Sequence, residues 1–234
     1  MVYFTFQFDS MKRVALLSFI FFLLLSTEVF SQRIMGGLSI GMNLTQVDGD
    51  EYYGFKKFGL NVGPMAIVPL DKNKRWTISL ELLYSQKGSN YNGRTDTTSY
   101  KLRLDYVDIP VLFHFTDKRV ISGGVGFAYG QLINVKEWKK GTVTDSITLQ
   151  GPYNMGDLSV VADLQIRLWS KLWVDVRYQY SMLMIRKDVP FSDPTNPKNT
   201  WTRNQYNNVV SLRLTWVFNQ EIPVKSKKRS GSQE

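Results

Sequence analysis

The chain has 234 residues, with 29 Lys or Arg against 20 Asp or Glu, so its formal net charge is +9 at pH 7. It contains no cysteine, which excludes disulfide bonds and also a lipid anchor carried on a cysteine. The basic residues are spread along the chain, so we expect no nucleic-acid partner and attribute the charge to attraction for anionic lipid head groups.

The first 31 residues have the pattern of a secretory signal peptide. A basic start at residues 11–13 precedes an apolar run over residues 14–25, and small or permissive residues follow as far as Ser31. The apolar run is too short for a membrane-spanning helix, which needs about 20 residues. We predict cleavage after Ser31, and the position of the basic residues makes Met11 a second candidate for the true start.

Apolar and polar residues alternate in eight segments within residues 32–218. Successive side chains of a strand point to opposite faces, so this alternation predicts eight β-strands. The links between the segments alternate between long and short, which is typical of an all-β, antiparallel, up-and-down transmembrane barrel with short periplasmic turns. We place the strands at about residues 34–45, 55–70, 76–87, 99–115, 119–133, 158–168, 172–184 and 210–218.

The fourth of these segments changes its pattern in the middle. Its apolar residues are even-numbered as far as Tyr106 and odd-numbered from Val107 onward. One extra residue in a strand exchanges its two faces, so we predict a β-bulge after Asp105. On this interpretation both apolar sets face outward, including Tyr100, Leu102, Leu104 and Tyr106.

Charged residues also lie on the polar faces of the predicted strands. In a soluble barrel such as a lipocalin this face is the exterior, whereas in a membrane barrel it is the interior, where charges must pair. The signal peptide, the aromatic strand ends and the loop lengths favour the membrane barrel. Eight strands enclose an interior that side chains fill, so we predict an ionic network and no wide permanent pore. Its predicted members are Glu81, Asp163, Arg167, Asp175, Arg177 and Arg213.

Three short motifs occur in order along the chain. They are residues 48–50 (DGD) with residues 54–57 (GFKK), residues 80–88 (LELLYSQKG) and residues 106–112 (YVDIPVL). Together they resemble the PorT-like outer-membrane β-barrel family of Bacteroidota, over nearly the whole mature chain. The resemblance implies an eight-stranded outer-membrane barrel. One branch of that family is tied to protein secretion, and the motifs transfer no catalytic residue.

His114 is the only histidine and therefore the one candidate for an imidazole general base. A small outer-membrane acyltransferase would also need a nearby Ser and an acid, and the sequence leaves that arrangement open. Our topology places His114 near the periplasmic end, whereas enzymes of that kind act at the outer face. A lone histidine is a weak signal, so we predict no enzymatic activity and no cofactor.

Two long loops carry candidate contact residues. The acidic residues of the first loop, together with Glu51, could offer oxygen ligands to calcium, but their spacing lacks the calcium-loop pattern and a solvated turn is the simpler interpretation. The third loop combines basic and aromatic residues that suit a glycan or lipopolysaccharide phosphate, or an interfacial anchor. The candidates are Asp48 and Asp50 on the first loop, and Trp138, Lys139 and Lys140 on the third.

Residues 219–234 form a polar, basic tail that is too short to fold alone, and we place it in the periplasm. We expect contact with outer-membrane lipid or lipopolysaccharide, and with secretion or envelope proteins. The first functional hypothesis is a non-enzymatic structural, assembly or secretion-associated barrel. The alternatives are a barrel that binds a surface ligand through its external loops and, more weakly, a small outer-membrane enzyme.

Overall fold

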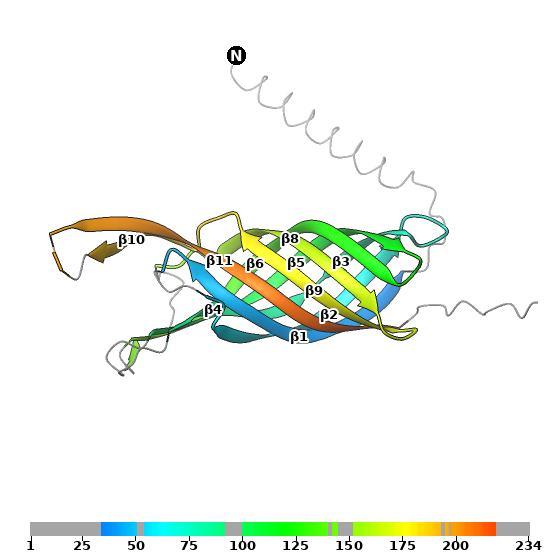
Figure 1. Ribbon diagram of the computed structural model, residues 1–234, viewed down its shortest axis with the longest axis horizontal. Helices are drawn as coiled ribbons and strands as arrows, with labels where there is room; N and C mark the ends of the chain where they lie inside the picture. The colour runs from blue at the N-terminus through cyan, green and yellow to red at the C-terminus, as the bar shows by residue number, and fades with distance from the viewer. Residues whose placement is uncertain are drawn as a thin grey trace, which may run out of the picture. The chain divides into compact units, whose positions relative to one another are not determined.

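The computed structural model describes residues 34–50, 54–91, 100–139, 142–144, 152–192, 195–196 and 198–218 (Figure 1). The predicted signal peptide and the predicted C-terminal tail lie outside these residues. Within them, no helix is long and apolar enough to cross a membrane.

The described residues form antiparallel strands, eight of which close into a ring. Strands β3 and β4 make up one spanning strand, because both pair with β2 on one side and with β5 on the other. The ring closes where β1 pairs with β11, and this confirms the eight-stranded up-and-down barrel. The strands are β1 (Met35–Asp48), β2 (Lys57–Pro69), β3 (Trp76–Glu81), β4 (Leu83–Tyr91), β5 (Tyr100–Asp117), β6 (Ile121–Lys139), β7 (Thr142–Thr144), β8 (Gly156–Arg167), β9 (Leu172–Ser181), β10 (Arg186–Ser192) and β11 (Thr200–Val217).

The exposure of alternating side chains decides which face is outside. On β11, Leu212 and Leu214 are 50% and 47% exposed, whereas Ser211 and Arg213 between and beside them are each 1% exposed. A soluble barrel would bury the apolar set instead. The soluble-barrel alternative is therefore excluded, and the apolar exterior is the surface expected against lipid.

The predicted β-bulge lies at the expected level of the barrel but on the neighbouring strand. The register between β5 and β6 shifts at Asp105, where Ile133 of β6 is the extra residue. Strand β5 keeps one alternation throughout, so Leu102 and Leu104 are completely buried inside the barrel. The prediction that Tyr100, Leu102, Leu104 and Tyr106 face outward is wrong, because this part of the interior is itself apolar. These residues pack with Val47, Leu132, Val135 and Ile185.

Several strands are longer than the alternation predicted. Strands β5, β6 and β11 have 18, 19 and 18 residues, whereas a tilted spanning strand needs about 9–11. All three extend past the ring on the side of the long loops, where β7 pairs with β6 and β10 pairs with β11 (Figure 1). We predicted the last strand only from residue 210, because the polar residues at the start of β11 do not show the alternation of a lipid-facing strand.

Candidate functional site

A cluster of ion pairs crosses the middle of the barrel. Arg177 of β9 makes a two-pronged contact with Glu81 of β3, with nitrogen–oxygen distances of 2.7 and 3.0 Å. Its Nη2 also lies 2.7 Å from the Asp163 carboxylate of β8. Arg213 of β11 shares the Glu81 carboxylate at 2.9 Å and contacts Asp175 of β9 at 2.6 Å. Four strands thus place five charged side chains, each no more than 5% exposed, in one network.

Arg167, the sixth residue predicted for this network, does not belong to it. It forms no ion pair with any other described residue, and its guanidinium carbon lies 4.7 Å from the centre of the Trp173 ring. The reason is its position at the last residue of β8, one short turn from the mouth of the barrel. The alternation predicted its face correctly but did not resolve its depth along the barrel axis.

A second buried cluster lies on the side of the first that faces the long loops and was missed at the level of the sequence. The ammonium of Lys87 lies 3.1 Å from Asp108 and 3.4 Å from Asp157, and all three side chains are at most 1% exposed. Lys87 also stands 4.5 Å from the centre of the Tyr106 ring, and Asn207 donates to Asp157 at 3.0 Å. The inward parity of Lys87 and Asp108 was the available signal, but Lys87 is the last residue of its predicted strand and Asp157 precedes the sixth predicted strand.

His114 lies inside the barrel near the short turns. Its Nε2 is 3.0 Å from the Ser79 hydroxyl, and its Nδ1 has no hydrogen-bond partner among the described residues. The ring packs directly over Gly124, where even a Cβ atom would collide with it. In the described part of the chain no carboxylate hydrogen-bonds to this imidazole, so the orienting acid of a Ser–His–acid arrangement is not formed there.

Of the acidic residues predicted for the first loop, Asp48 is hydrogen-bonded to neighbouring side chains and Asp50 is buried. Asp48 accepts hydrogen bonds from Gln46 at 2.6 Å and from Asn208 at 3.3 Å, and Asp50 is only 4% exposed. Glu51 lies outside the described residues. No group of three or more candidate metal ligands occurs in the part of the chain that the structure describes.

The extension of β5 and β6 carries a compact group of cations. Lys101 pairs across the strands with Trp138, and Arg103 pairs with Lys136. The Lys101 ammonium lies 5.2 Å from the centre of the Trp138 ring. These four residues, which we call the basic block, share the outer face of the two strands, because Glu137 and Val135 of β6 point inward. The side chain of Lys139 and the whole of Lys140 lie outside the described residues.

A further set of contacts joins β6 to the structure at the long-loop end of the barrel. The Tyr153 hydroxyl donates to the Glu137 carboxylate at 3.4 Å, and the Arg186 guanidinium lies 5.2 Å from the Tyr153 ring centre. Burial and the nearby carboxylate raise the pKa of Tyr153 to about 12, so this hydroxyl stays protonated at neutral pH. Tyr153 thereby links β6 to the beginning of β10.

Residues 30–184 match the family described as outer membrane protein β-barrel domain, and the chain belongs to that family. It is an integral protein of the outer membrane. No curated protein matches it.

Among solved structures, the chain is similar to the Ail attachment invasion locus protein of Yersinia pestis, with 16% identity and a TM-score of 0.46 over 79% of this chain and 98% of that one. It is also similar to Neisserial surface protein A, with 10% identity and a TM-score of 0.42 over 79% and 96%. A third similar structure is the N-terminal β-barrel domain of Pseudomonas aeruginosa OprF, with 9% identity and a TM-score of 0.35 over 80% of this chain and 98% of that one.

Proposed function

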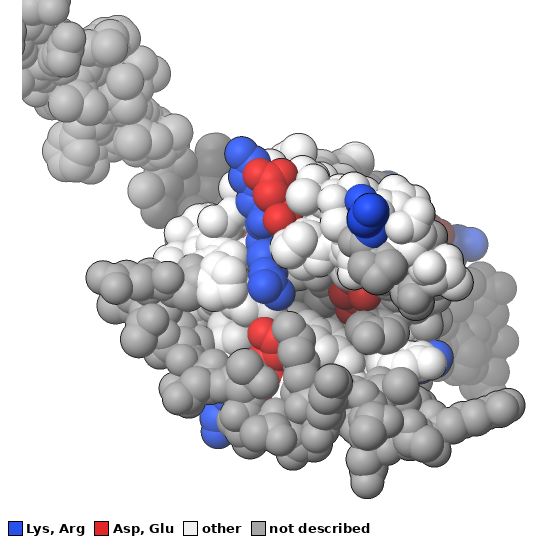
Figure 2. Space-filling view, turned by 90° about the vertical axis from the view of Figure 1, so that its left-hand side faces the viewer, with Lys and Arg blue, Asp and Glu red and all other residues white. Residues whose placement is uncertain are grey.

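We propose that this protein is a non-enzymatic, closed barrel that binds an anionic partner at the cell surface through its extracellular strand extensions. The observation that carries the proposal is the basic block, in which Lys101 lies over the Trp138 ring and the neighbouring Arg103–Lys136 pair shares the same outer face. Phosphate groups pair with cations, and the apolar parts of a glycan pack on aromatic rings. Figure 2 shows this end of the barrel, where several Lys and Arg side chains lie in a row with Asp and Glu side chains beside it.

Lipopolysaccharide phosphate is the partner that this position favours. The basic block lies on the outer face of the barrel, on the stretch of β5 and β6 that follows the bulge at Ile133. Arg103 is partly neutralised by Asp105 at 2.9 Å, whereas Lys101 and Lys136 are exposed and contact no described carboxylate. The two lysines are therefore the residues whose removal should weaken binding most.

The test is the effect of lipopolysaccharide on the unfolding of the barrel in phosphatidylcholine vesicles. A ligand of the folded state raises the free energy of unfolding, so we expect purified lipopolysaccharide to raise the urea midpoint of the natural chain. The Lys101→Gln/Lys136→Gln double variant should lose most of that increase. The control variant Lys187→Gln removes a lysine of β10 whose side chain is 68% exposed, and it should retain the increase in the urea midpoint. An equal response of all three proteins would refute a role for the basic block.

A structural, assembly or secretion-associated role, as the PorT-like resemblance implies, is the second candidate. The observation that favours it is a basic cavity at the periplasmic mouth, the end that a periplasmic partner can reach. Purification of the tagged chain from outer membranes in mild detergent distinguishes the two roles. Stoichiometric periplasmic or secretion proteins would support this second role, whereas lipopolysaccharide alone would support the first.

A further inference from the structure

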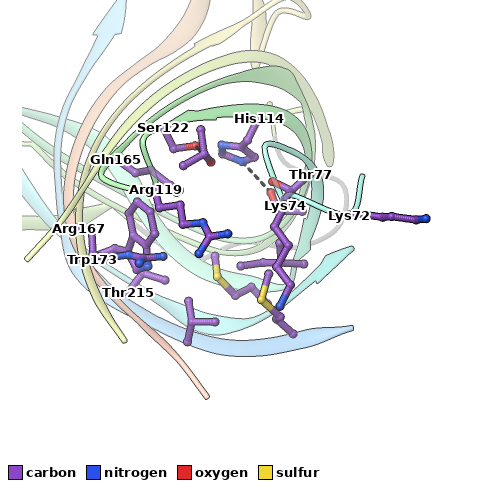
Figure 3. A pocket seen from close by; sticks show the side chains of 16 residues that line it. Lys72, Lys74, Thr77, His114, Arg119, Ser122, Gln165, Arg167, Trp173 and Thr215 are labelled. Atoms are coloured by element: carbon purple, nitrogen blue, oxygen red, sulfur yellow. Dashed lines mark hydrogen bonds between the residues drawn. The ribbon is translucent and has the colours of Figure 1, made fainter. Parts of the chain in front are cut away.

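The mouth of the barrel beside the short turns contains a cavity of about 210 Å³. Residues of all eight spanning strands and of two turns line it, and Figure 3 shows the side chains that surround it. Behind it the network around Glu81 and Arg177 fills the barrel, so the cavity opens only toward the periplasm. It is a binding pocket by its geometry and not the entrance of a channel.

All the charged side chains that line this cavity are positive. None of the 16 described residues that line it is Asp or Glu, whereas four are basic: Lys72, Lys74, Arg119 and Arg167. Neither arginine forms an ion pair with a described residue, and the Nε of Arg167 is buried without a hydrogen-bond partner. In Figure 3 the Arg119 side chain reaches toward the middle of the cavity, whereas Lys72 points away from it.

The turn that contains Arg119 has a backbone conformation that its central residues, Lys118 and Arg119, rarely adopt. Val120 donates to Asp117 at 3.0 Å, and the two central residues, Lys118 and Arg119, have φ angles of 46° and 58°. A two-residue hairpin turn with both central φ angles positive strongly favours Asn and Gly. Arg119 therefore stands where Asn would fit the backbone better, and from there its guanidinium reaches the cavity.

The remaining lining divides into a polar and an apolar part. Hydroxyl groups of Thr77, Ser79, Thr116 and Ser122 lie on the side of His114, whose Nδ1 is unpartnered. Met35, Trp173 and Val217 form an apolar cluster on the other side, with Ile67 against it. The pocket therefore suits a small group that carries negative charge at one end and hydrocarbon at the other.

We propose that this pocket binds a phosphate ester, with Arg119, Arg167 and Lys74 as the groups that hold the phosphate. Guanidinium groups match the oxygens of phosphate with paired hydrogen bonds, and the hydroxyls can donate to the remaining oxygens. The apolar cluster receives the carbon part of the ester. The source is either the head group of a phospholipid in the inner leaflet or a soluble periplasmic phosphate ester. The proposal is independent of the basic block, which lies at the opposite end of the barrel.

The test compares two substitutions in one turn. Both Arg119→Asn and Lys118→Asn remove one positive charge and place a better-suited residue at a positive φ, so both variants should fold at least as well as the natural chain. Of these two residues, only Arg119 lines the cavity. We expect glycerol 3-phosphate, titrated calorimetrically into the full chain in maltoside detergent, to bind saturably. Arg119→Asn should weaken that binding at least tenfold and Lys118→Asn less than twofold.

A second arm identifies the source of the phosphate. The three proteins are placed in nanodiscs of phosphatidylcholine with a minor share of phosphatidic acid, and native mass spectrometry counts the phosphatidic acid retained. Retention that Arg119→Asn abolishes and Lys118→Asn preserves would support a lipid head group, with or without binding of the soluble ester. Binding of glycerol 3-phosphate alone would support a soluble ligand. Absence of both, or equal weakening by both substitutions, would overturn the proposal.

Discussion

The two halves of the barrel interior are filled by different chemistry. The half toward the short turns contains the network of Glu81, Arg177 and Arg213, in which each charge depends on a partner from another strand. The half toward the long loops is mainly apolar: Leu102 and Leu104 are completely buried among other apolar side chains, with one smaller ion cluster around Lys87 beside them. The comparison shows that one barrel closes its interior twice, once by charge pairing and once by packing.

The two kinds of filling should respond differently when one member is lost. Removing one partner from a buried ion pair leaves an uncompensated charge, which costs about 3–5 kcal/mol. Removing buried methyl groups leaves a cavity, and its cost of about 2–5 kcal/mol depends on how far the surroundings can relax. Substitutions in each half therefore measure how strongly each kind of filling stabilises the fold.

The largest effect is expected from Glu81→Ala. Glu81 accepts hydrogen bonds from both arginines at 2.7 to 3.0 Å, whereas Asp163 lies 2.7 Å from Arg177 and 3.6 Å from Arg213. Its loss leaves Arg177 with Asp163 and Arg213 with Asp175, so buried guanidinium nitrogens of both arginines lose an acceptor. We expect the free energy of unfolding to fall by about 3–5 kcal/mol. Urea unfolding of the chain in phospholipid vesicles measures this change.

Asp188→Asn is the matched control for that experiment. It also removes one carboxylate, but Asp188 and its partner Lys187 are 64% and 68% exposed and lie 3.8 Å apart. Exposed pairs contribute about 0–1 kcal/mol, so unfolding should hardly change. Equal losses for the two variants would mean that the interior network stabilises no more than a surface pair.

A smaller effect is expected from Leu104→Ala in the apolar half. Leu104 is 0% exposed and belongs to the cluster with Tyr106 and Leu132. Its truncation should lower the free energy of unfolding by about 2–4 kcal/mol, since the neighbouring loop residues can partly fill the space. Leu212→Ala on the lipid-facing surface is the comparison in the same vesicles, because Leu212 is 50% exposed and leaves no interior cavity. A larger loss for Leu212 would contradict the assigned faces.

The same two halves explain what the sequence could predict. In the polar half, strict alternation along β11 assigned Leu212 outward and Arg213 inward, because only one of the two faces is apolar. In the apolar half the pattern is inverted, because near Leu104 the inner face of β5 is apolar and the outer face carries Lys101 and Arg103. Alternation therefore identified a change without showing which face was inside. The change of pattern along β5 arises because the interior is apolar at one end of the barrel and polar at the other. The extra residue of the bulge lies on β6.

Contacts across the barrel were beyond the sequence for a different reason. Glu81 and Arg213 are 132 positions apart, and their meeting depends on the stagger of every strand between them. Alternation gives the face of a residue but not its depth, which is why Arg167 was assigned to the network although it lies at the mouth. The basic cavity was missed because Arg119 and Lys74 belong to turns, where no alternation exists.

The smallest expected effect concerns conductance, and it tests whether the two halves close the barrel independently. We expect the natural chain in a planar bilayer to form no stable channel of about one nanosiemens, since side chains fill an eight-stranded interior. Glu81→Ala opens space in the polar half only, and Leu104→Ala in the apolar half only, so each single variant should remain closed. The double variant loses filling at both levels and is the one in which brief openings should first appear. A stable channel in either single variant would mean that one layer alone closes the barrel, and that the other contributes stability without blocking passage.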